Sequence, residues 1–193
     1  MSRAEIKARA KAQLGRNLFG GTWLIAIVVL LIQSVLSSIP LVSIIVAGPI
    51  TFGVAALFLK QARDGKTMEI GELFRGFQED FGGTFLLWLF TTIFTALWSM
   101  LFVIPGIVKS YAYSMGYYLK ADHPEYTWQQ CLSESQRIMK GHKMDLFIQD
   151  LSFIGWMIVG SFCCGIGTLW VMPYMMAARA QFYESLRYAP AAV

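Results

Sequence analysis

The sequence predicts an all-α membrane protein: a polytopic bundle of six transmembrane helices in three hairpins, with short amphipathic interfacial helices. Three stretches of the chain, 17–59, 81–108 and 151–178, contain no charged residue. A membrane-spanning helix needs ~20 mostly apolar residues, so each stretch holds two passes or nearly two. Hydrophobic residues make up 56% of the chain and charged residues 15%, whereas soluble domains have about 45–50% and 25%. The excess apolar surface therefore requires lipid.

The elements follow from the turn signals inside each stretch. We expect outbound helices near 19–39, 83–103 and 144–161, and inbound helices near 41–60, 105–120 and 167–187. The outer turns near Ser38, Ile104 and Gly165 have no acidic or basic residue within three positions on either side. Each unit also has a proline near the expected start of its second helix, at Pro49, Pro105 and Pro173, where a missing N–H is tolerated.

Internal repetition supports one domain built from three similar units. The sequence Phe-Gly-Gly-Thr at 19–22 recurs at 81–84, and a weaker third copy lies at 140–143. This period of about sixty residues is typical of a repeat architecture. We therefore expect a single integral membrane domain over 1–193, with pseudo-repeats 1–62, 63–124 and 125–193.

A short amphipathic segment precedes each hairpin. The segments at 2–5 and 127–130 fit the capping-box pattern of a helix N-terminus. In the second segment, apolar residues recur at helical spacing, at Ile70, Leu73, Phe74 and Phe77. Such helices either lie in the membrane interface with the apolar face down or pack on the cytoplasmic end of the bundle, and both arrangements remain open here.

The basic residues predict the topology. They cluster between the apolar stretches and at the two ends of the chain, so the positive-inside rule places these segments, and both termini, in the cytoplasm. The basic N-terminus does not predict a signal peptide, because the apolar run through Ile39 is too long. Anionic lipid explains the net charge of +4 better than nucleic acid does. The residues expected to contact lipid headgroups are Arg3, Lys7, Lys11, Arg16, Lys140 and Lys143.

Charged residues at membrane depth are costly and are candidates for function. Asp150 and Arg179 lie at equal distances from the centre of the third hairpin, so the two side chains are expected at the same depth and predicted to pair. The pair either has a structural role or belongs to an ion or proton relay with Glu184 and Asp145.

Lys109 is the third such residue and lies one turn after Pro105. Its ammonium group either extends to the outer surface or faces a cavity. In the second case, a polar stripe on the same helix accompanies it, consisting of Ser110, Tyr113, Ser114 and Tyr117.

The residues that enzymes use for catalysis are not arranged in any familiar pattern. His123 and His142 lack metal-ligand spacing, and phosphate-binding and nucleophile motifs do not occur. Cys163 and Cys164 are adjacent, where a disulfide would be strained, and have no nearby histidine for a metal site. We therefore expect no enzymatic activity, no cofactor and no metal.

The part of the chain from Pro105 onward resembles an uncharacterised bacterial membrane-protein family, the domain of unknown function 975. The resemblance lies in 105–111, 139–143, 151–156, 173–174 and 182–183, and the element Leu-Ser-Phe-Ile-Gly-Trp at 151–156 is the most specific. It implies a multi-pass inner-membrane protein without an established activity.

Two functions are compatible with these patterns. The first is a non-enzymatic membrane scaffold or accessory protein that engages membrane lipids, or a protein partner, through its basic amphipathic helices. The alternative is a small transporter or channel-like protein with an internal polar site formed by Lys109, Asp150 and Arg179. The sequence indicates no oligomeric state.

Overall fold

The computed structural model describes residues 3–14, 21–37, 40–64, 69–101, 103–162 and 167–187, and this part of the chain is helical without any β-strand. The all-α prediction is therefore confirmed. The elements are α1 Arg3–Leu14, α2 Gly21–Ser37, α3 Pro40–Asp64, the 3-10 helix η1 Ile70–Phe74, α4 Arg75–Gln78, α5 Phe81–Leu101, α6 Val103–Tyr113, α7 Gly116–Asp122, α8 Trp128–Ile138, α9 Lys143–Phe162 and α10 Thr168–Arg187.

The predicted helices agree closely with the observed ones, with one exception. The inbound helix expected at 105–120 is broken into α6 and α7 by a turn at Ser114 and Met115. The buried Ser135 of α8 bridges the break. Its hydroxyl donates a hydrogen bond to the Ala112 carbonyl (2.7 Å) and accepts one from the Met115 N–H (3.2 Å). Backbone groups that lose their helical partners are thus satisfied by a neighbouring helix, which sequence periodicity alone does not reveal.

The prediction for the prolines was right at only one of three positions. Pro105 lies in the first turn of α6, but Pro49 and Pro173 lie inside α3 and α10. α3 begins instead at Pro40. Around Pro49 the chain is closely packed, because a Cβ added at Gly76 would lie 2.6 Å from the Pro49 carbonyl oxygen.

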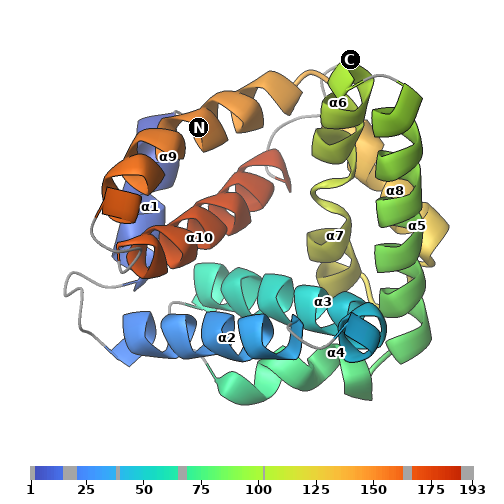
Figure 1. Ribbon diagram of the computed structural model, residues 1–193, viewed down its shortest axis with the longest axis horizontal. Coiled ribbons are helices and arrows are strands. Elements are labelled where there is room, and N and C mark those ends of the chain that lie inside the picture. Colours follow the sequence, from blue (N-terminus) through green and yellow to red (C-terminus); the bar gives the residue numbers. More distant parts are fainter. Residues whose placement is uncertain are drawn as a thin grey trace.

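The hairpins do not form one parallel bundle. In Figure 1, α2 and α3 lie across the molecule, while α5 stands upright beside α6 and α7, and α9 and α10 occupy the opposite side. α3 is the central element and contacts α2, α5, α7 and α10. Its second half supplies much of the apolar core, including Leu57 and Phe58, and buried residues of α1 and α10 complete it.

Two described helices are long and apolar enough to cross a membrane, judged by length and composition only: Ile44–Asp64 and Phe81–Leu101. They differ in environment. In the apolar part of α3, 67% of the residues are buried inside the protein, as expected of a central helix, whereas in α5 only Thr84 and Leu87 are buried. Crossings by the other predicted helices are not established by this criterion, so the number of passes remains a prediction.

The contact between α3 and η1 gives a test of the packing. A Cβ at Gly53 would lie 2.0 Å from the Leu73 carbonyl oxygen, which is backbone and cannot swing away. Gly53→Ala is therefore expected to lower the thermal midpoint of the purified protein strongly, by the equivalent of about 2–3 kcal/mol. Gly71→Ala is the matched control, since nothing lies within 4 Å of its added methyl group. Equal midpoints for the two variants would contradict this packing.

Candidate functional site

The predicted pairing of Asp150 with Arg179 is confirmed. Arg179 Nη2 lies 2.7 Å from Asp150 Oδ2, and Nε donates a longer hydrogen bond of 3.4 Å to Oδ1. A third helix joins the pair, because the Tyr111 hydroxyl donates to Asp150 Oδ2 (3.2 Å). The pair therefore links α9 and α10 to α6, and the hairpin register predicted from the sequence is correct.

Lys109 neither extends away from the protein nor joins this pair. Its Nζ donates a hydrogen bond to Gln136 Oε1 of α8 (3.2 Å) and lies 5.2 Å from the centre of the Trp98 ring and 5.9 Å from that of Tyr113. Attraction between a cation and an aromatic face stabilises such an arrangement. Lys109 thus links α8 to the α5–α6 hairpin through these contacts.

The remaining members of the predicted polar site are not gathered into one place. The hydroxyls of Ser110 and Ser114 donate to carbonyls of their own helix, those of Ile107 and Tyr111. Tyr117 lies after the helix break. It packs against the main apolar core and against a second, smaller apolar cluster formed by Leu87, Tyr113, Cys131 and Leu132. Asp145 lies 3.3 Å from His142.

Glu184 belongs instead to a network at the ends of three inbound helices, which the sequence analysis did not identify. Arg63 of α3 donates to Glu184 Oε1 from Nε and to Asp122 Oδ1 from Nη1, both at 2.6 Å. The Tyr183 hydroxyl donates to Asp122 Oδ2 (3.0 Å), and Arg187 Nε lies 3.6 Å from the same oxygen. The C-terminal ends of α3, α7 and α10, one from each pseudo-repeat, therefore meet. Arg63, Asp122 and Glu184 are ordinary charged residues at helix ends, so the sequence did not indicate that they interact.

Asp122 makes this network sensitive to acid. Burial, the largest influence, raises the pKa of Asp122, but hydrogen bonds from Arg63 and Tyr183 and the charge of Arg63 outweigh it, so the pKa lies below 3.8. The ionised carboxylate therefore stabilises the fold fully above pH 3.8, the ordinary pKa of an aspartate. This stabilisation is lost as the pH falls through the lowered pKa that Asp122 has in the folded protein. At pH values below about 4, we expect the temperature of the unfolding midpoint to decrease. Asp122→Asn should have a lower midpoint at neutral pH and a smaller further loss in acid; an unchanged acid response would contradict the role of Asp122.

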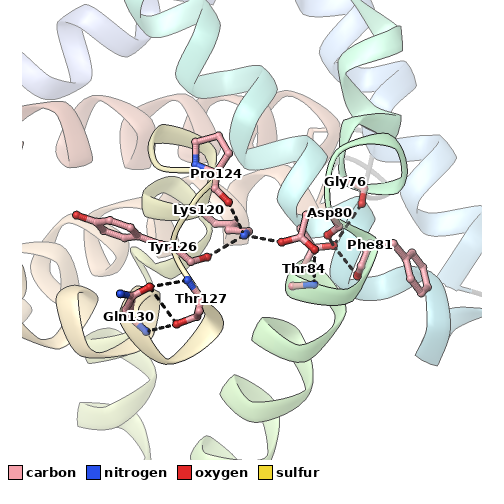
Figure 2. A network of polar contacts seen from close by, with 10 residues as sticks. Gly76, Asp80, Phe81, Thr84, Lys120, Pro124, Tyr126, Thr127 and Gln130 are labelled. Carbon is pink, nitrogen blue, oxygen red and sulfur yellow. Dashed lines mark hydrogen bonds and ion pairs between the residues drawn. The ribbon is translucent and has the colours of Figure 1, made fainter.

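A second group missed by the sequence analysis centres on Lys120, shown in Figure 2. Its side chain is 3% exposed, and its three N–H donors have three acceptors: Asp80 Oδ2 (2.6 Å) and the carbonyls of Pro124 and Tyr126 (both 2.8 Å). Lys120 is the last residue of the inbound helix predicted at 105–120, and the 123–127 loop folds over its ammonium group. A lysine is rarely buried unless it is paired, and here every donor is satisfied.

Asp80 in turn fixes the start of α5. Its Oδ1 accepts a hydrogen bond from the Gly83 N–H (2.8 Å), which is a side-chain cap. A Cβ at Gly83 would lie 2.0 Å from Asp80 Oδ2, so the repeated Gly-Gly pair leaves room for this carboxylate. Burial raises the pKa of Asp80, yet hydrogen bonds from Lys120 and Gly83 outweigh it and lower the pKa overall.

The amphipathic helices pack on the protein. The capping box at Thr127 and Gln130 is confirmed, and α8 buries Cys131 and Leu132 against Leu87 and Tyr113. α1 likewise buries Ile6 and Ala10 in the main core. Both helices therefore bury their apolar faces against other helices of the protein. The capping box predicted at 2–5 includes residues outside the described part.

The residues predicted to contact headgroups divide into three groups. Lys7 Nζ lies over the Phe153 ring at 4.6 Å and thus faces a neighbouring helix. Lys11 and Lys140 are exposed and Lys143 is half-exposed, and no ion pair involves them within the described ranges. Arg16 and the Arg3 side chain are outside the described part.

Groups of three or more metal-ligating side chains do not occur within the described residues. Cys163 and Cys164 lie outside them. Cys131 is a free, buried thiol, and burial raises its pKa to about 11, so its side chain is an apolar contact rather than a nucleophile.

The fold and its polar groups define a helical protein with one largely uncovered apolar helix, α5, and with ion pairs that join different helices. Residues 100–189 match the family model described as "Protein of unknown function (DUF975)", which confirms the resemblance found in the sequence for this part of the chain. No curated protein and no solved structure matches the chain. The family description assigns no activity.

Proposed function

We propose that the protein is an integral protein of the bacterial cytoplasmic membrane, and that it acts as a non-enzymatic scaffold or accessory protein engaging lipid. The observation that carries this proposal is the environment of α5. Its 21 residues carry no charge, and only Thr84 and Leu87 among them are fully buried inside the protein. A core helix of a soluble protein would be covered by its neighbours, whereas an uncovered apolar helix of this length is stable in hydrocarbon.

The proposed topology places both termini in the cytoplasm. Each hairpin returns the chain to the side from which it started, so both termini lie on one side, and the basic segments on that side favour the cytoplasm. Six crossings satisfy it, and so do hairpins that enter and leave on one side. The meeting of the α3, α7 and α10 ends at Arg63 supports it, because these ends are predicted to lie on the same side.

The proposed scaffold role follows from how the buried charges are used. Lys120, Arg63 and Arg179 are each held by acidic partners on other segments, which favours a fixed framework. Lys11, Lys140 and Lys143 are left to bind anionic headgroups.

The alternative function, a small transporter or channel-like protein, is supported by one observation. Gln149 is 1% exposed, and neither its amide nitrogen nor its amide oxygen has a partner in the described structure. It precedes the ion-paired Asp150, and a buried unpaired amide requires a water or a ligand. Solute flux through proteoliposomes that Gln149→Leu abolishes would favour this alternative.

Membrane extraction tests the leading proposal. The expressed protein should stay with membranes in alkaline carbonate, require detergent for purification, and place a reporter fused at Val193 in the cytoplasm. Protein that is monodisperse in buffer without detergent would refute it.

Lipid analysis tests the proposed role. Changing Lys11, Lys140 and Lys143 together to Gln should reduce the anionic lipid that co-purifies with the protein, as measured by mass spectrometry. Arg137→Gln is the control, since Arg137 already pairs with Glu134 at 2.5 Å. An unchanged lipid content in the triple variant would count against lipid engagement by these lysines.

A further inference from the structure

Two polar helices, α1 and α8, are packed against the middles of two hairpins. α8 contacts the α5–α6 hairpin through Ser135, which bonds the Ala112 carbonyl. α1 contacts the α9–α10 hairpin, because the Tyr174 hydroxyl donates to the Lys7 carbonyl (3.2 Å) and Lys7 Nζ lies over Phe153. Counted along the sequence, Ala112, Phe153 and Tyr174 are each about ten residues from the turn of their hairpin, which is roughly 15 Å of helix.

This depth is about half the ~30 Å thickness of the hydrocarbon layer. If the two hairpins crossed the membrane with their turns at the outer surface, α1 and α8 would lie near the bilayer centre. The outward faces of both helices are polar: Arg9 and Lys11 of α1 are exposed, as are Gln129 and Arg137 of α8. Charged side chains that meet lipid at this depth are strongly unfavourable. Full crossing is therefore incompatible with the observed packing.

The half of the α5–α6 hairpin nearest its turn exposes an apolar surface, in contrast to the polar outward faces of α1 and α8. Five of its large apolar side chains are strongly exposed: Leu97 (64%), Met100 (90%), Leu101 (66%), Val103 (69%) and Ile104 (76%). Near the end of α8, Lys109 lies against Trp98 and Gln136. Tryptophan and lysine are typical of the boundary between headgroups and hydrocarbon. Beyond the end of α8, therefore, the surface of the α5–α6 hairpin changes from polar to apolar and is not covered by another helix of the described structure.

We propose that the α5–α6 and α9–α10 hairpins enter the cytoplasmic leaflet tip first and end near the bilayer centre, with α1 and α8 at headgroup level. The ligand of this surface is one leaflet of lipid. The inference rests on the proposed membrane location and replaces full crossing for these two hairpins; it leaves both termini on the cytoplasmic side. The ion networks around Arg63 and Lys120 then lie toward the cytoplasm.

Depth measurements at two matched positions test this inference. Ile93 and Ile104 are both exposed, at 46% and 76%, and lie in the middle and at the tip of the same hairpin. Each is changed to Cys in the full chain with Cys163 and Cys164 replaced by Ala, and labelled with an environment-sensitive fluorophore. The buried Cys131 is retained, and the parent without an added cysteine measures its background. The proteins are reconstituted in phosphatidylcholine–phosphatidylglycerol vesicles brominated either near the headgroup or near the acyl-chain end.

The two arrangements predict opposite orders. For a leaflet-inserted hairpin, the Ile104→Cys label is quenched more by deep bromines, and the Ile93→Cys label more by shallow bromines. The reverse order means that the hairpin crosses, which overturns the inference and leaves the membrane proposal intact. Similar shallow quenching at both sites means that the hairpin lies flat, which also overturns it. If neither label is quenched, the proposed membrane location itself fails.

Discussion

Lys120→Met should destabilise the protein more than any change at an exposed lysine. The methionine side chain fills a similar volume but donates no hydrogen bond, so the Asp80 carboxylate loses its cation and the carbonyls of Pro124 and Tyr126 lose their donor. Removing one partner of a buried ion pair costs about 3–5 kcal/mol. Because Asp80 is 42% exposed, solvent compensates part of this cost, and we expect about 2–3 kcal/mol.

Thermal unfolding in detergent measures the effect, and two further variants make it specific. Asp80→Asn should cost less, since Lys120 keeps both carbonyl acceptors. Lys60→Met should cost least, because Lys60 is 45% exposed and pairs with Glu72 near the surface. The expected order of midpoints is therefore Lys60→Met, then Asp80→Asn, then Lys120→Met as the lowest. A midpoint for Lys120→Met equal to that of Lys60→Met would show that the loop does not close over the ammonium group.

The second large effect is expected at the α9–α10 ion pair. Asp150→Ala leaves the Arg179 guanidinium without its carboxylate and removes the acceptor of the Tyr111 hydroxyl. Arg179→Ala combined with Asp150→Ala removes both charges. Asp150→Ala alone should therefore lower the yield and midpoint more than the double change does, with a coupling energy of about 1–2 kcal/mol.

A double-mutant cycle with midpoints in one detergent measures this coupling, and Tyr111→Phe is the control. It removes only the hydrogen bond to Asp150 and leaves the ion pair, so its loss should be smaller than that of Asp150→Ala. Additive losses, or equal damage from the single and double variants, would refute an energetic pairing.

The pairing of Asp150 with Arg179 was predictable from the sequence for a geometric reason. Antiparallel helices of equal rise bring residues at equal distance from their turn to the same level, so counting from 164 and 165 was sufficient. The helix boundaries were predictable for a similar reason, since uncharged stretches and turn residues are local signals. The capping box at Thr127 and Gln130 is also local, and it was confirmed.

The partners of Lys109, Lys120 and Glu184 were not predictable in this way. Each lies on a different helix or loop from its partner, and no periodicity relates them. Lys120 ends a predicted helix beside a basic segment, and only the folding of the 123–127 loop reveals that it is buried. The break between α6 and α7 depends on Ser135, which is twenty residues further along the chain than the Met115 N–H that it binds.

The sequence by itself determined that the protein is helical, where its helices begin and end, and that charge is kept out of three long stretches, because these properties depend on neighbouring residues. The tertiary structure alone decided which charges meet, that α1 and α8 pack against hairpins, and which apolar helix stays uncovered. Those outcomes depend on contacts between different elements, such as the close approach of Gly53 in α3 to Leu73 in η1, which local sequence patterns do not encode.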